Sequence, residues 1–216
     1  MKKIEDIFTV NRIVPVVVIN DINAAIPLAE TLLSSGINTM EITLRTENAR
    51  KIIEKVAKEV PQMLVGAGTI RTAADYVDAC NAGAEYIISP GVTNELLSAA
   101  SRGPKHVRYI PGVVTPSQVM DCADHDVKYL KFFPAEPYNA YEVIKSLSSV
   151  FPDVKFCPTG GISNANVGKY VQLANIFAAG MSSIVEAKLI AAHDFAEIKR
   201  RCDESVAIVK QILNLA

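Results

Sequence analysis

Short apolar runs rich in β-branched residues alternate with longer segments of helical periodicity along this chain. Residues 13–19 form the first run, and a near-continuous apolar run is typical of a strand buried on both faces. Asp21 then predicts the start of a helix, and Gly36 predicts its end. The pattern occurs eight times, with strands predicted over 13–19, 37–43, 64–67, 86–88, 108–110, 128–133, 154–157 and 176–179. The helices after them are predicted over 21–35, 47–60, 73–81, 94–101, 116–123, 140–150 and 164–171, with a last helical stretch that reaches 213.

The strict alternation of strands and helices predicts an α/β fold, because parallel strands need crossover helices. Eight units favour a (β/α)8 barrel, and the chain length lies near the lower end for that fold, at about 200 residues. We expect one domain over residues 1–216, with a short helix over 1–10 before the first strand. An open, doubly wound sheet is the alternative architecture that the same pattern allows.

Composition narrows the classes of partner. The chain has 216 residues, of which 50% are hydrophobic and 21% charged, and its formal net charge is −1. Without a basic stripe or a long charge run, neither nucleic acid nor an anionic membrane is an expected partner. We see no signal peptide and no apolar run of the roughly 18 residues that a membrane span needs, so we expect a cytoplasmic protein. The four cysteines and three histidines are scattered, so we do not expect a metal site.

Two charged residues lie inside apolar strands. Lys131 lies in Tyr-Leu-Lys-Phe-Phe, and Glu41 lies between Met40 and Ile42. Because side chains alternate along a strand, both charges enter one barrel interior if their faces point inwards. A desolvated amine favours its neutral form, which attacks a ketone to give a Schiff base, and Glu41 is then a candidate general acid/base. For an isolated pair, a lysine that extends to solvent or a structural ion pair is the more common interpretation.

Glycine-rich turns follow the last two predicted strands, at residues 159–163 and 180–182. Glycine lets an anion approach the backbone, and helix N-terminal N–H groups favour negative charge. One such turn is as often a plain tight turn, but two at successive strand ends favour a phosphate site. Arg45, after the second strand, is a candidate clamp for a carboxylate, although a solvated arginine is the commoner interpretation for a single residue.

Seven short motifs, in this order and spacing, resemble the 2-keto-3-deoxy-6-phosphogluconate / 4-hydroxy-2-oxoglutarate aldolase family over nearly the whole chain. The motifs are residues 14–16 (VPV), 41–46 (EITLRT), 66–69 (GAGT), 88–91 (ISPG), 111–112 (PG), 131–136 (KFFPAE) and 158–163 (PTGGIS). The resemblance implies a (β/α)8 barrel, a homotrimer, no metal or other cofactor, and a small keto acid as substrate.

The same resemblance implies roles for individual positions. Lys131 would form the imine with the keto carbon, and Glu41 would act as general acid/base through a water. Arg45 and Thr69 would hold the pyruvate carboxylate with help from Thr159.

Five further positions would shape the rest of the pocket. Phe133 and Pro90 would line it, and Gly160, Gly161 and Ser182 would hold a distal phosphate. Two stretches depart from the family pattern on this distal side. Many relatives have Gly-Gly where residues 138–140 read Tyr-Asn-Ala, and many have Gly-Gly-Ser where residues 180–182 read Gly-Met-Ser. Both departures weaken the phosphate assignment and leave the lysine and glutamate positions unchanged.

We therefore predict a class I aldolase that cleaves a 2-keto-4-hydroxy acid to pyruvate and an aldehyde. The aldehyde would be glyceraldehyde 3-phosphate from the phosphorylated sugar acid, or glyoxylate from 4-hydroxy-2-oxoglutarate. One alternative is another phosphate-binding barrel enzyme, an isomerase or synthase, which the glycine turns fit equally well. A non-catalytic metabolite-binding barrel is a third hypothesis.

Overall fold

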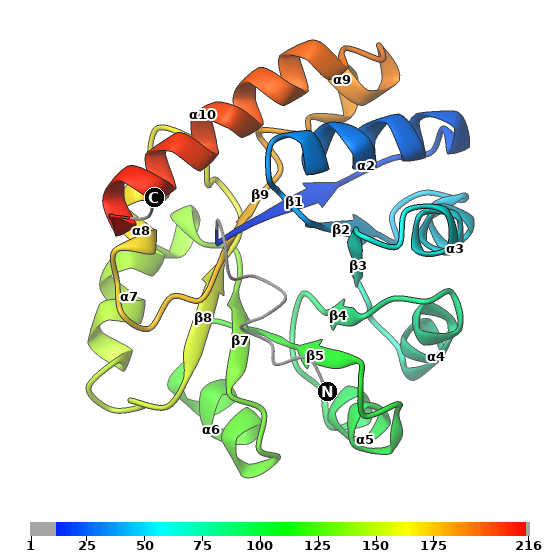
Figure 1. Ribbon diagram of the computed structural model, residues 1–216. Helices are drawn as coiled ribbons and strands as arrows, with labels where there is room; N and C mark the ends of the chain where they lie inside the picture. The colour runs from blue at the N-terminus through cyan, green and yellow to red at the C-terminus, as the bar shows by residue number, and fades with distance from the viewer. Residues whose placement is uncertain (1–11, 215–216) are drawn as a thin grey trace.

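The computed structural model describes residues 12–214, in which strands and helices alternate along the chain (Figure 1). The strands are β1 (Ile13–Val17), β2 (Thr39–Thr43), β3 (Leu64–Gly68), β4 (Tyr86–Ile88), β5 (Arg108–Ile110), β6 (Gly112–Val113), β7 (Tyr129–Phe132), β8 (Lys155–Pro158) and β9 (Ala179–Met181). The α-helices are α2 (Ala25–Ser34), α3 (Ala49–Glu59), α4 (Ala73–Asn81), α5 (Asn94–Arg102), α6 (Pro116–Asp124), α7 (Ala140–Leu147), α8 (Val167–Val171), α9 (Ala187–Ala191) and α10 (Phe195–Leu213). Two 3-10 helices, η1 (Ile22–Ala24) and η2 (Glu136–Tyr138), complete the list of helical elements in this range.

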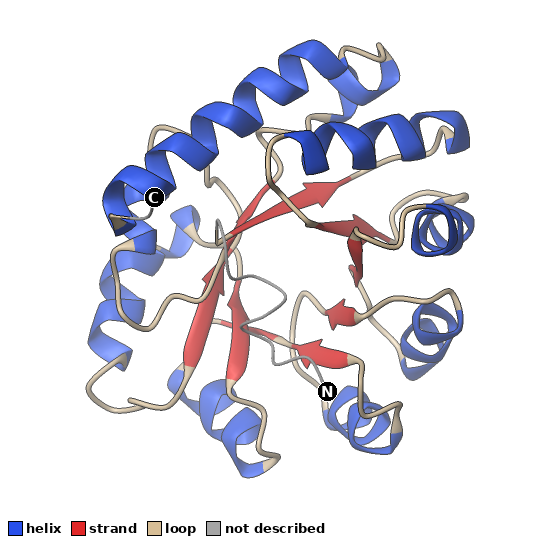
Figure 2. Ribbon diagram, viewed as in Figure 1, coloured by secondary structure: helices blue, strands red, loops and turns tan. Residues whose placement is uncertain are grey.

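The prediction of a closed (β/α)8 barrel is wrong for the described residues. Their strands form a curved six-stranded parallel half-barrel, in the order β5-β4-β3-β2-β1-β9, and a separate three-stranded sheet, β6-β7-β8. Figure 2 shows the helices on the outer side of these strands, which also disagrees with a doubly wound sheet. The short helix predicted over residues 1–10 lies outside the described residues.

Two local features separate the sheets. Pro111 separates β5, which matches the predicted strand over 108–110, from β6, and a proline has no N–H group to donate to a ladder. Between β8 and β9, pairing is limited to the isolated bridges Phe156–Ile176 and Thr159–Gly180. Hydrogen bonding is therefore discontinuous at both edges of the three-stranded sheet.

Threonine caps begin three successive helices on the loops after β3, β4 and β6. The side chains of Thr72, Thr93 and Thr115 accept hydrogen bonds from the backbone N–H groups at the start of α4, α5 and α6. Thr115 also forms a reciprocal capping box with Gln118. Each cap contributes about 1 kcal/mol to stability and sets where the preceding loop ends.

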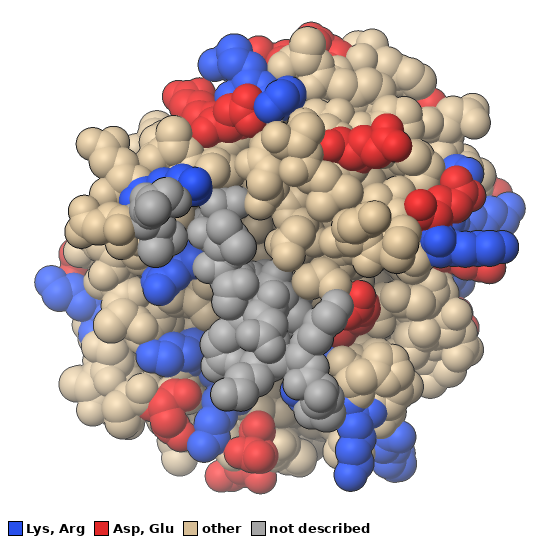
Figure 3. Space-filling model, viewed as in Figure 1, with Lys and Arg blue, Asp and Glu red and all other residues tan. Residues whose placement is uncertain are grey.

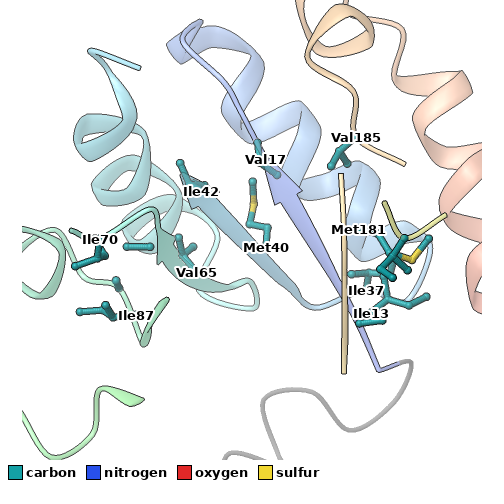
Figure 4. Packing of buried hydrophobic residues seen from close by; sticks show 14 of the residues in the cluster. Ile13, Val17, Ile37, Met40, Ile42, Val65, Ile70, Ile87, Met181 and Val185 are labelled. Carbon is teal, nitrogen blue, oxygen red and sulfur yellow. The ribbon is translucent and has the colours of Figure 1, made fainter. Parts of the chain in front are cut away.

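The two faces of the strands differ in chemistry. Met40 and Ile42 of β2 belong to the large apolar cluster between sheet and helices, together with Val65 and Ile87 of the next strands (Figure 4). The alternate positions point to the other side, where the inner cluster is much smaller. Polar residues of the strands, above all Glu41, can therefore face the interior without disturbing the main core.

Charge on the surface is mixed. Lysine and arginine are interspersed with aspartate and glutamate around the face in Figure 3, and neither sign dominates it. Among residues 12–214, no helix combines the length and the apolar character required to cross a bilayer.

Candidate active site

Lys131 of β7 and Glu41 of β2 meet in the interior although they belong to different sheets. Their side chains are 5% and 1% exposed, and 3.5 Å separates the Lys131 Nζ atom from the Glu41 Oε1 atom. The strand pattern left open whether the side chains of Lys131 and Glu41 point inwards. Both do, and they meet in the same interior. Neither side chain reaches solvent, which disagrees with a lysine that extends outwards.

The Glu41 carboxylate is under-satisfied. Within the described part of the chain, neither carboxylate oxygen of Glu41 has a hydrogen-bond partner. The carboxylate does form an ion pair with Lys131, at a distance of 3.5 Å. Buried polar atoms in folded proteins nearly always have such partners. A carboxylate in this state is suited to bind a polar group or a water that enters the interior and to exchange a proton with it.

Phe133 adds an apolar wall beside the amine. The Lys131 Nζ atom lies 5.0 Å from the centroid of the Phe133 ring. The peptide bond between Phe133 and Pro134 is cis. Lys131, Glu41 and Phe133 are thus brought together as the motifs predicted.

Cys157 is a neighbour of this pair that the sequence reasoning missed. It is the register partner of Lys131 across β7 and β8, and it is buried. Burial raises the pKa of the Cys157 thiol to about 12, although the nearby Lys131 opposes that rise. The thiol therefore stays protonated at neutral pH and does not compete with the amine as a nucleophile. Its position at the end of a predicted strand, level with Lys131, was the signal that could have found it.

Two glycines were also missed, and each makes room for a site residue. A Cβ atom on Gly68 would lie 2.1 Å from the Oε1 atom of Glu41, and one on Gly180 would lie 2.2 Å from the Oγ1 atom of Thr159. Real Cβ atoms do not approach other atoms so closely, so only glycine lets these side chains occupy their positions. Gly68 belongs to the GAGT motif, which was used for the family resemblance and not for any role of this glycine.

Arg45 and Thr69 form a second pair, on the loops after β2 and β3. The Arg45 Nε atom donates to the Thr69 hydroxyl at 3.2 Å, and Arg45 is exposed. Thr69 has a φ of 62°, in the left-handed region that a β-branched residue rarely occupies. Such strain costs about 1–3 kcal/mol and gathers at functional sites.

The distal loop, which we define as Thr159–Gly161, follows β8. Gly160 and Gly161 have φ values of 101° and 82°, and the Thr159 hydroxyl lies 3.9 Å from the Cys157 sulfur. Among the described residues, the backbone N–H groups of Gly161 and Ser182 donate to no protein acceptor, whereas the Gly160 N–H faces the Gly180 carbonyl across the isolated bridge. Two free donors at two adjacent strand ends can hold an anion.

Two further positions, Pro90 and Met181, are arranged differently from the residues of the distal loop. For Pro90, at the end of β4, the structure shows a backbone contact: a Cβ atom on Gly112 would lie 2.3 Å from the Pro90 carbonyl oxygen. Met181, one of the departures from the family pattern, is fully buried in the outer apolar cluster near Ile13 and Ile37 (Figure 4). The methionine side chain therefore does not enter the interior.

The positions of the side chains that could ligate a metal ion can be compared in the same structure. Within residues 12–214, no group of three or more histidine, cysteine, aspartate or glutamate side chains gathers as potential metal ligands. Among the described residues, Lys131 and Glu41 are the charged residues that are buried.

Comparison with known proteins gives consistent matches. A family model described as KDPG and KHG aldolase matches residues 4–201. The 2-dehydro-3-deoxy-phosphogluconate aldolase of Pseudoalteromonas atlantica is 40% identical over 94% of both chains, and so is the KHG/KDPG aldolase of Escherichia coli. The solved structure of a KDPG aldolase from Legionella pneumophila, with pyruvate captured as a covalent carbinolamine intermediate, superposes with a TM-score of 0.91. That match has 38% sequence identity and covers 95% of this chain and 98% of the other.

Proposed function

Because this chain belongs to the KDPG and KHG aldolase family, we propose that it is a class I aldolase, a carbon–carbon lyase that works through a Schiff base on Lys131. Its substrates are 2-keto-4-hydroxy acids, which it cleaves to pyruvate and an aldehyde. The observation that supports this proposal best is the buried amine of Lys131, 3.5 Å from the Glu41 carboxylate.

The proposed reaction begins with proton transfer from the Lys131 ammonium, directly or through a water, to Glu41. The neutral amine adds to the keto carbon to form a carbinolamine. Glu41 returns its proton to the carbinolamine hydroxyl, which leaves as water, so that an iminium forms and Glu41 is again a carboxylate. Glu41 then accepts the proton of the C4 hydroxyl while the C3–C4 bond breaks. The electron pair of that bond moves towards the iminium nitrogen, and an aldehyde leaves.

The second half of the proposed reaction restores the enzyme. Glu41 returns a proton to C3 of the enamine, so that an imine of pyruvate forms. Water adds to that imine and releases pyruvate with the free amine of Lys131. Each bond that breaks is matched by one that forms, and no oxidant or reductant is required.

The neighbouring groups have proposed binding roles. Arg45 and Thr69 hold the keto-acid carboxylate, helped by Thr159, because a guanidinium and two hydroxyls suit a planar anion. Phe133 and Pro90 line the pocket. The low-dielectric wall of Phe133 strengthens the interaction between the charges that form at the imine.

The distal loop and Ser182 are proposed to hold a terminal phosphate when the substrate has one. Gly161 and Ser182 supply backbone N–H groups for its oxygens, and Gly160, which has no side chain, lets the phosphate approach the loop. The Met181 side chain leaves this space open, because it packs on the outer side of the sheet. We therefore propose both 2-dehydro-3-deoxy-6-phosphogluconate and 4-hydroxy-2-oxoglutarate as substrates.

Trapping the intermediate tests the proposal. Pyruvate plus borohydride, in buffer that contains EDTA, is expected to add a three-carbon mass to Lys131, found by peptide mass spectrometry. Both substrates are expected to release pyruvate under the same conditions. An unmodified Lys131 in folded protein would contradict the aldolase proposal. An anion-dependent isomerase or synthase reaction that survives loss of this lysine would favour the alternative enzyme class.

Gly68 offers a test of the Glu41 position. Gly68→Ala is expected to lower kcat by about 10²-fold, because a methyl group would push the carboxylate by an ångström or more and reacting groups tolerate little displacement. Steady-state cleavage measures the effect. Gly91→Ala is the matched control, since a Cβ atom there meets nothing within 4 Å. Equal activity of the two variants would show that the carboxylate position is unimportant.

Three broader expectations remain predictions. A homotrimer, a single domain over residues 1–216 and a cytoplasmic location follow from the sequence and the family resemblance. Analytical ultracentrifugation of the purified chain tests the trimer directly.

A further inference from the structure

Glu136 has no role in the proposed reaction, yet it lies against the distal loop. It ends the KFFPAE motif and begins η2, five residues after Lys131. The Ala135 N–H group donates to the Thr159 carbonyl at 2.8 Å, and the Glu136 N–H group donates to the Gly160 carbonyl at 3.0 Å. The turn that carries Glu136 thus pairs with the loop in the manner of a short strand.

The Glu136 side chain also passes directly under the loop. A Cβ atom on Gly161 would lie 2.8 Å from both the Cβ and the Cγ atoms of Glu136. Gly161 already has a φ of 82°, which favours glycine independently of this contact. The loop and the Glu136 side chain therefore fit together only with this small residue between them.

Beyond the loop, the Glu136 carboxylate accepts hydrogen bonds from two side chains. The buried hydroxyl of Tyr170 donates to Oε1, and the Lys169 Nζ atom lies 3.1 Å from the same oxygen. Asn166 also lies near the carboxylate and helps to lower its pKa. These bonds tie the start of η2 to helix α8, which follows the distal loop in the chain.

Asn166 closes this network on the loop itself. Its Nδ2 atom donates to the Gly161 carbonyl at 2.9 Å, and its Oδ1 atom accepts from the Ser163 N–H group at 2.8 Å. Glu136 is consequently linked to the loop twice, through its own backbone and through Asn166. The Thr159 and Gly160 carbonyls accept from the Ala135 and Glu136 N–H groups, so the peptide planes that carry the N–H groups of Gly160 and Gly161 are held, and Asn166 holds the next plane.

The charge of this network is well defined. The Tyr170 hydroxyl, followed by Lys169, lowers the pKa of the Glu136 carboxyl, whereas burial raises the pKa of Tyr170. Glu136 is therefore a carboxylate and Tyr170 a phenol at neutral pH. The nearby Lys169 ammonium offsets a negative charge that would otherwise repel a bound phosphate.

We propose that Glu136 is a positioning residue that holds the Thr159–Gly161 loop in the conformation that binds the distal phosphate group. It acts through Asn166 and the backbone, and touches no reacting atom. Substrate preference follows, because the phosphate of a long keto acid uses Gly160 and Gly161, whereas a short unphosphorylated keto acid contacts the loop only through Thr159. This inference rests on the proposed function of the loop.

Kinetics of Glu136→Ala on the full chain separate the two substrates. KM for the phosphorylated substrate is expected to rise about tenfold, the size of one lost charge-assisted contact. For 4-hydroxy-2-oxoglutarate, kcat and KM are expected to stay within about twofold, as is the rate of borohydride trapping with pyruvate. Glu142→Ala is the matched control, because it removes an exposed acidic residue from the adjoining helix α7.

Two further variants distinguish positioning from general damage to the fold. Glu136→Gln keeps the size of the side chain and one acceptor oxygen, so it is expected to recover most of the affinity for the phosphorylated substrate. Tyr170→Phe removes one donor and is expected to raise that KM by a smaller factor than Glu136→Ala. Equal losses for both substrates, or an unchanged KM for the phosphorylated one, would overturn the proposal.

A binding measurement separates this inference from the aldolase proposal. Inorganic phosphate is titrated into the wild-type and Glu136→Ala proteins by calorimetry, without any turnover. Weaker phosphate binding by the variant supports the positioning role even if neither substrate is cleaved. Equal phosphate affinity of the two proteins overturns it even if the wild-type protein is an active aldolase.

Discussion

Lys131→Ala is expected to abolish Schiff-base formation and to lower kcat by about 10⁴-fold or more, because no other group supplies the electron sink for carbon–carbon cleavage. Pyruvate with borohydride should add no mass to the variant. Steady-state release of pyruvate and peptide mass spectrometry measure the two effects.

The same substitution has a consequence for stability. It leaves the Glu41 carboxylate buried without its ion-pair partner, and removal of one member of a buried pair costs about 3–5 kcal/mol. Chemical denaturation monitored by circular dichroism measures this loss. Lys128→Ala is the control, since that lysine precedes the same strand but pairs with Asp153 at the surface. Wild-type cleavage by Lys131→Ala, or trapping at a different lysine, would contradict the assignment of the nucleophile.

Glu41→Gln is expected to lower kcat by about 10²- to 10⁴-fold, because an amide of the same shape cannot exchange a proton with the substrate. The lysine remains in place, so borohydride trapping with pyruvate should persist at a reduced rate. The role of Glu41 as acid/base can be measured separately in the step that protonates the enamine. In heavy water, the wild-type enzyme is expected to exchange the methyl protons of pyruvate, and the variant is expected to do so far more slowly.

Proton NMR of pyruvate follows that exchange over time. Glu47→Gln, an exposed residue after the same strand, is the matched control. If Glu41→Gln exchanged the methyl protons at the wild-type rate, another group would have to move the proton, and Glu41 would be left with a purely structural role.

The family and the type of enzyme were recognisable from short motifs alone, and the comparisons confirm them. The chemistry is concentrated at strand ends, so a few residues at fixed spacing carry a specific signal. The faces of Lys131 and Glu41 were likewise predictable, because side chains alternate along a strand whatever surrounds it. The helix starts predicted at residues 73, 94 and 116 agree with α4, α5 and α6, and the structure shows a threonine cap directly before each of them.

The closed barrel was predicted incorrectly because a count of eight units says nothing about hydrogen bonding between them. Pro111 separates β5 from β6, and, among the described residues, 176–178 approach β8 only through an isolated bridge. Strand pairing depends on how sheet edges meet in space, which no local pattern encodes.

What the sequence by itself determined is the set of chemical groups, their order and the face of the strand that each one takes. Only the tertiary structure decided that the amine and the carboxylate lie 3.5 Å apart, that Gly68 gives the carboxylate its room, and that Met181 turns away from the interior. The physical reason is the distance along the chain over which each effect acts. Alternation and capping act over a few residues, whereas these distances arise from sheet curvature and from the packing of the outer apolar cluster, to which distant segments contribute together.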